Sequence, residues 1–141
     1  MEWLMVNDQL PLPMPKQYKF VIDGKLIGYN EYGNQQRTNY YKANKTKRSI
    51  QDDLRRQILA QVKLPIRTIK TQVNVHCHWI EPNKKRDKDN ISSAIKFILD
   101  TLVHMRLLKN DGWQQIGDIK HTFVHNTQSN GGVIVILDTI E

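Results

Sequence analysis

The stretch that decides the fold is NISSAIKFILDTLVHM, residues 90–105. Its apolar residues recur at intervals of three and four, which is the spacing of one face of an α-helix. These residues are Ile91, Ala94, Ile95, Ile98, Leu102 and Met105. The sequence therefore predicts an amphipathic helix from about Asn90 to Met105 that packs this face against a core.

Shorter apolar runs on both sides of this helix have the alternation of β-strands. The predicted strands span Tyr18 to Asp23, Thr71 to Ile80, Ile116 to Val124 and Val133 to Leu137. A second amphipathic helix is predicted from Lys45 to Val62, and the Gly- and Asn-rich residues 28–44 are expected to form a long loop. We therefore expect a single compact α+β domain with a mixed sheet and two main helices.

The N-terminal residues are expected to lie outside this domain. Pro11, Pro13 and Pro15 alternate with other residues there, and proline at such spacing prevents a regular helix. A chain of 141 residues has the usual size of one domain. We predict an extended arm over residues 1–17 and a folded domain over residues 18–141.

Composition narrows the class of protein further. The chain has 21 Lys and Arg against 14 Asp and Glu, a net charge of +7, which raises the prior for a polyanionic partner such as nucleic acid. Cys77 is the single cysteine, so no internal disulfide can form, and a reducing cytoplasmic location is expected. No window has enough consecutive apolar residues to span a bilayer, so no membrane partner is expected.

Three aspartates flank the predicted helix. Asp87 and Asp89 precede it, and in an extended chain two residues at this spacing point to the same side. Asp111 follows the helix and returns to the same place only if the exit loop folds back. Carboxylates held close together repel one another unless a cation intervenes, and hard oxygen ligands favour Mg²⁺ or Mn²⁺. The alternative is a solvated charged turn, since short acidic motifs often arise by chance.

Lys96 strengthens the case for a phosphate-processing site. Asp89, Ser93, Lys96 and Asp100 fall at helical intervals and form one polar stripe opposite the apolar face. A lysine on that stripe can orient a scissile phosphate or neutralise its charge. The alternative is an ordinary surface ion pair between Lys96 and Asp100.

Two groups of basic residues are candidate DNA contacts. The first comprises Arg37, Lys42, Lys45, Lys47 and Arg48, with Tyr40 and Tyr41 among them as possible stacking partners for unpaired bases. The second comprises Lys84, Lys85 and Arg86, which directly precede the acidic pair. Cations beside metal-ligating acids suit the delivery of a phosphate backbone. The alternative for the first group is a solvated surface.

The neighbouring residues His76, Cys77 and His78 have the composition of a metal-ligand cluster. Strand alternation sends Cys77 to the face opposite both histidines, and no second Cys or His pair at zinc spacing supports them. We therefore interpret them as part of a half-polar strand.

Residues 86–116, RDKDNISSAIKFILDTLVHMRLLKNDGWQQI, resemble the RusA family of Holliday-junction resolvases, particularly its bacteriophage and prophage members. The family pattern is a DxDN motif, a lysine and an aspartate on the following helix, and then an acidic turn. Upstream, DGKLIGYNEY at residues 23–32, with Arg37, Asn39, Tyr40, Ala43 and Lys45, is similar to the family's N-terminal strand and basic loop. The resemblance covers roughly Tyr18 to Val124.

The resemblance implies a specific site and activity. Asp87, Asp89 and Asp111 would be metal-binding catalytic carboxylates, Lys96 a catalytic lysine and Asp100 a supporting residue. The family works as a homodimer that makes paired incisions in four-way DNA junctions with Mg²⁺ or Mn²⁺, in recombination and repair.

Residues and resemblance together give one main hypothesis and two alternatives. The main hypothesis is a homodimeric, divalent-metal-dependent endonuclease for branched DNA, encoded by a phage or prophage and acting in the cytoplasm of a bacterial host. One alternative is a basic module that binds DNA structures without cutting them. The other is a metal-dependent nuclease for flaps or single strands.

Overall fold

The computed structural model describes residues 13–140, and everything said below concerns that range. The alternation of strands and helices follows the sequence pattern closely. In chain order the elements are β1 (Gln17–Asp23), α1 (Tyr29–Thr38), α2 (Tyr40–Leu59), β2 (Val73–Glu81), α3 (Lys88–Ser92), α4 (Ile95–His104), β3 (Ile116–His125) and β4 (Gly132–Thr139).

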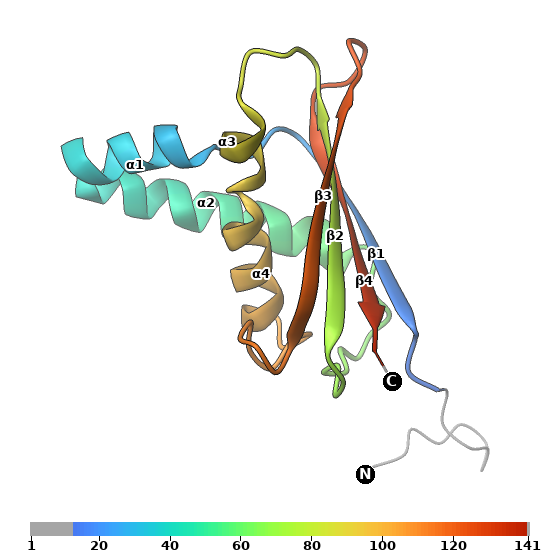
Figure 1. The fold of residues 1–141 in the computed structure, drawn as a ribbon. Helices are drawn as coiled ribbons and strands as arrows, with labels where there is room; N and C mark the ends of the chain where they lie inside the picture. The colour runs from blue at the N-terminus through green and yellow to red at the C-terminus, as the bar shows by residue number, and fades with distance from the viewer. Residues whose placement is uncertain (1–12, 141) are drawn as a thin grey trace.

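The strands form one mixed, four-stranded sheet in the order β1-β4-β2-β3. β4 runs antiparallel to both β1 and β2, whereas β2 and β3 are parallel and are joined by the crossover through α3 and α4. The helices lie on one side of the sheet, and the α1–α2 hairpin extends away from it (Figure 1). The expected single compact α+β domain with a mixed sheet is confirmed.

The core lies between the sheet and the helices. Alternate residues of β2, namely Val73, Val75, Cys77 and Trp79, are buried on the helix side. Ile98 and Leu102 of α4 and Leu54 of α2 are fully buried against them. The apolar side chains that alternate along the strands and those that recur along residues 90–105 thus pack together in one core.

Residues 28–44 are helical, so the prediction of a long loop there is wrong. α1 and the first turns of α2 form a helical hairpin, with Asn39 between them accepting a hydrogen bond from Lys42 N at 3.0 Å. The hairpin buries only small residues, Gly33 and Ala43. Because close packing through small residues leaves no apolar stripe, the periodicity test does not detect these helices.

The predicted helix over residues 90–105 is interrupted at Ser93 and Ala94. Ser93 Oγ donates to Asn90 O at 2.6 Å and accepts from Tyr29 N at 2.9 Å. Serine hydroxyls compete for backbone hydrogen bonds in this way. The interruption therefore joins the start of α1 to the segment between α3 and α4.

The remaining boundaries differ from the predicted ones by a few residues. α2 begins at Tyr40, five residues before the predicted start at Lys45. The predicted arm of residues 1–17 lies outside the described residues up to residue 12, and its last residue, Gln17, belongs to β1. Within residues 13–140, no helix has the length and apolar character needed to cross a membrane.

Candidate functional site

The acidic pair, Asp87 and Asp89, lies at the start of α3, after the turn that follows β2. Asp87 occupies the N-cap position of α3 in an extended conformation, and Asp89 lies in the first helical turn. The expectation that both residues stand in extended chain is therefore wrong for Asp89. Both side chains are exposed, and Asp89 Oδ1 accepts a hydrogen bond from Asn90 N at 2.9 Å. Carboxylates at a helix start are favoured by the helix dipole.

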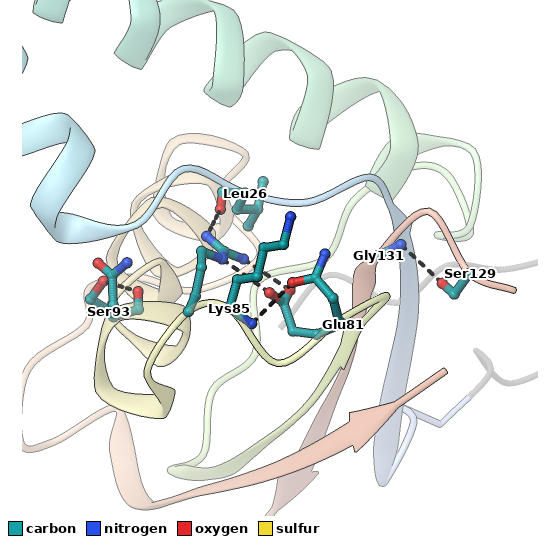
Figure 2. A network of polar contacts seen from close by, with 9 residues as sticks. Leu26, Glu81, Lys85, Ser93, Ser129 and Gly131 are labelled. Atoms are coloured by element: carbon teal, nitrogen blue, oxygen red, sulfur yellow. Dashed lines mark hydrogen bonds and ion pairs between the residues drawn. The ribbon is translucent and has the colours of Figure 1, made fainter. Parts of the chain in front are cut away.

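Arg86, a predicted DNA contact, has its hydrogen-bond partners within the protein, and a contact with DNA stays a prediction. Its Nε and Nη2 donate to the two carboxylate oxygens of Glu81 at 3.0 and 2.9 Å, and its Nη1 donates to Leu26 O at 2.8 Å (Figure 2). The side chains of Arg86 and Glu81 are only 13% and 8% exposed. Arg86 thus ties the segment before Asp87 to the end of β2 and to the loop after β1.

Asn90 makes a second connection, from α3 to the first turn of α1. Its Oδ1 accepts from Asn30 N at 3.0 Å. A Cβ at Gly28 would lie 2.4 Å from the same oxygen, so a larger residue there would displace the Asn90 side chain. Together with Arg86, Asn90 fixes the backbone on both sides of Asp87 and Asp89.

Lys96 lies between two carboxylates. Its Nζ is 3.0 Å from Asp100 Oδ1 and 3.2 Å from Asp111 Oδ2. These hydrogen bonds, that to Asp100 first and that to Asp111 second, raise the pKa of Lys96. Lys96 therefore carries its charge at neutral pH, while its side chain remains 68% exposed.

The exit loop after α4 brings Asp111 to Lys96. Leu107 and Leu108 donate their backbone N–H groups to Leu102 O and bury their side chains, which folds the loop back along the helix. Asn110 Oδ1 then accepts from Asp111 N at 2.8 Å. The exit loop thus folds back as far as Lys96, and the expected return of Asp111 to Asp87 and Asp89 stays a prediction.

The three predicted metal ligands do not form a ready-made metal site. Within residues 13–140, no group of three His, Cys, Asp or Glu side chains is placed to hold a metal ion. Asp87 and Asp89 are nevertheless exposed oxygen donors, and Mg²⁺ is commonly held by one or two carboxylates together with waters and substrate phosphates. The donor chemistry fits such an ion, and the convergence of all three carboxylates stays a prediction.

The first group of basic residues lies on the helical hairpin of α1 and α2. Arg37 lies in the last turn of α1, while Lys42, Lys45, Lys47 and Arg48 lie on α2, and all except the half-buried Lys47 are exposed. We call these five residues the basic hairpin. Farther along α2, an open hollow is lined by Lys45, Arg48, Ser49, Asp52, Arg55 and Arg56. Because the cations stand on helices, their relative positions are more fixed than those of a loop.

The predicted DNA contacts Lys84 and Lys85 and the predicted stacking residues Tyr40 and Tyr41 are exposed, as is Tyr29. Lys84 and Lys85 are exposed in the turn before α3. Tyr40 and Tyr41 are 67% and 87% exposed at the corner of the hairpin, and Tyr29 at the start of α1 is 65% exposed. These side chains are accessible to a large ligand.

The sequence analysis missed the basic and aromatic character of the exit loop. Trp113 is 95% exposed, and Arg106 and Lys109 are exposed in the same loop. The sequence did carry a signal for this: Trp113 directly follows the turn-forming Gly112. It belongs to no apolar run with helical or strand spacing, so its side chain is not expected to be buried.

The two histidines of β2, His76 and His78, lie on the polar face of the strand. His76 Nε2 and His78 Nδ1 each lie 2.8 Å from Thr122 Oγ1 on the side of the sheet opposite the helices. Cys77 is fully buried on the helix side, where burial raises the pKa of its thiol to about 12. This is the arrangement predicted from strand alternation.

Comparison with known proteins adds no family assignment: the chain matches no protein-family model and no curated protein.

Proposed function

We propose that this protein is an endonuclease for branched DNA that resolves four-way junctions by paired, divalent-metal-dependent incisions. The observation that carries the proposal is the contact of Lys96 with Asp100 and Asp111. It unites a helix residue with an aspartate from a separate loop, in a pattern that the sequence analysis connected with phosphodiester cleavage. The resemblance of residues 86–116 to the RusA family supports the same activity.

In this proposal the aspartates and Lys96 have different roles. Asp87, Asp89 and Asp111 would hold Mg²⁺ or Mn²⁺, which when bound activates water and stabilises the departing oxygen. Lys96 keeps Asp111 in position through its ion pair, and its exposed ammonium group is free to meet a phosphate oxygen. Asp100 fixes the lysine from the other side.

The DNA is held largely through its phosphates. The basic hairpin with Lys84 and Lys85 provides exposed cations, and such contacts position a nucleic acid without reading its sequence. Paired incision in a junction requires two sites related by a twofold axis, so we propose a homodimer. We further propose a cytoplasmic role in recombination and repair within a bacterial cell, with the gene carried by a phage or prophage.

A second function is favoured by the exposed cations of the basic hairpin together with the exposed Lys84 and Lys85. A basic module that binds branched DNA without cutting it would need these cations alone, and its affinity would depend strongly on salt.

One assay separates these functions. Purified protein is incubated with a four-way junction, a flap and a linear duplex, each with Mg²⁺, Mn²⁺ or a chelator. The Asp89→Asn variant is measured beside it, with Asp118→Asn as the matched control because Asp118 is an exposed aspartate on β3. We expect symmetric nicks in the junction that Asp89→Asn abolishes and Asp118→Asn retains, with junction binding kept by both variants.

Other results would point elsewhere. Binding without cutting under any cation would favour the non-catalytic module. Preferential cutting of the flap would identify the nuclease for flaps or single strands. Equal cutting of the linear duplex would show that the enzyme is not selective for DNA structure.

A further inference from the structure

We propose that Trp113 stacks on an unpaired base of the DNA at the candidate site, while Arg106 and Lys109 contact the adjoining phosphates. The inference rests on the proposed function, because it names the part of the nucleic acid that this site recognises. It assigns the exit loop a role in selecting branched over fully paired DNA, since only a branch or a single strand presents a base with a free face.

The first observation is the exposure of the indole. Trp113 is 95% exposed, whereas Trp79 is buried in the core at 2%. A tryptophan side chain offers the largest apolar area of any residue, and burying it against a partner is correspondingly favourable. Asn110 and Gln114, exposed residues of the same loop, are polar.

The second observation is that the backbone beneath the indole is held in place. Gln72 Nε2 donates to Trp113 O at 2.9 Å. Gly112 O accepts from the N–H groups of Gln115 and Ile116 at 3.1 and 2.9 Å, which closes a turn around Trp113. A side chain carried on a fixed backbone loses little conformational entropy when it binds, which makes it a suitable stacking platform.

The third observation is the position and charge of the loop. Trp113 follows Asp111 by two residues, and Asp111 contacts Lys96. Arg106 and Lys109 are exposed, and the charge of Asp111 is offset by Lys96. Exposed cations and an exposed aromatic ring, here carried on one loop, are the combination with which proteins bind unpaired nucleic acid.

The test compares DNA binding by four forms of the protein in the presence of a chelator, so that no cutting occurs. These are the wild type, Trp113→Ala, Trp113→Phe and, as the matched control, Lys109→Gln. Affinity is measured by fluorescence anisotropy for an oligo-dT single strand, a four-way junction and a linear duplex, over a series of salt concentrations. Thermal unfolding and sedimentation are measured for each variant.

We expect Trp113→Ala to weaken binding to the single strand and the junction by roughly tenfold, which is the scale of one base–aromatic stack. Duplex affinity and the salt dependence stay unchanged, because no charge is removed. Trp113→Phe restores most of the affinity. Lys109→Gln weakens binding to all three DNAs and lowers the salt dependence, because it removes one phosphate contact.

Three results would overturn the inference. Equal affinities of Trp113→Ala and wild type for the single strand and the junction would do so, and so would equal weakening for all three DNAs. A change in sedimenting mass would show that Trp113 contacts a second copy of the chain instead. If wild type cuts no DNA but the stacking pattern is observed, the endonuclease proposal fails and the inference stands.

Discussion

Arg86 and Glu81, five positions apart, form a buried ion pair in which Arg86 Nε and Nη2 meet both carboxylate oxygens of Glu81. This pair joins the last residue of β2 to the residue before Asp87. The acidic pair is thus anchored to the sheet, although Asp87 and Asp89 themselves are exposed.

We predict that Arg86→Met lowers the free energy of unfolding by about 3–5 kcal/mol, because Glu81 then remains as a buried charge without its partner. Arg56→Gln is the matched control, since Arg56 pairs with Asp53 at exposed positions and such pairs contribute about 0–1 kcal/mol. Urea unfolding measures both. Adding Glu81→Leu to Arg86→Met is expected to restore much of the lost stability, and no recovery in the double variant would contradict this account.

Lys96→Met is predicted to reduce junction cleavage by about a hundredfold, the scale observed when one group that stabilises the transition state is removed. Junction affinity should change little, because the basic hairpin remains. Single-turnover cleavage and chelator-stabilised binding measure the two effects separately. An unchanged cleavage rate would leave Lys96 with a structural role only.

Gly28→Ala is predicted to cost about 1 kcal/mol, because the new methyl group displaces the Asn90 side chain and removes its hydrogen bond to Asn30 N. Asn90→Ala removes the same hydrogen bond directly. In the double variant the two losses should therefore fail to add. Chemical denaturation of the four forms tests this, and simple additivity would argue against a shared contact.

Stability is predicted to decrease as the pH falls below about 6.5, the ordinary pKa of histidine. Burial first, and then the nearby charges of His78 and Lys120, lower the pKa of His76, against an opposing effect of Asp138. Burial also lowers the pKa of His121. A folded-state pKa below the unfolded value gives stability that is complete above the unfolded pKa and is lost as the pH falls through the folded one.

The measurement is the urea midpoint at neutral and mildly acidic pH. His76→Gln and His121→Gln should each reduce its pH dependence, with His104→Gln, an exposed histidine at the end of α4, as the control. An equal pH dependence in all forms would contradict the assignment.

Periodicity predicted the parts of the fold that bury large apolar side chains. The core face of residues 90–105 and the alternation of β2 were both found as expected, because Ile98, Leu102 and Val75 have to leave water. The hairpin of α1 and α2 was missed, because its close approach depends on Gly33 and Ala43, which leave no apolar stripe in the sequence.

The candidate site was predictable in its residue types and less so in its contacts. Spacing along a helix is enough to pair Lys96 with Asp100, whereas the contact with Asp111 requires the exit loop to fold back. The ion pair of Arg86 with Glu81 could not be predicted from the sequence. A basic residue beside two acids has the same sequence pattern whether it faces a ligand or a buried glutamate. Only the burial of Glu81 decides between them.

The crossover from β2 to the parallel strand β3 contains every acid of the candidate site together with Lys96. β3 starts five residues after Asp111, so the pairing of β3 with β2 limits where that aspartate can lie. A partly folded chain in which α4 has formed but β3 has not yet paired would lack this restraint. The contact between Asp111 and Lys96 therefore depends on a strand pairing between parts of the chain that are distant in sequence.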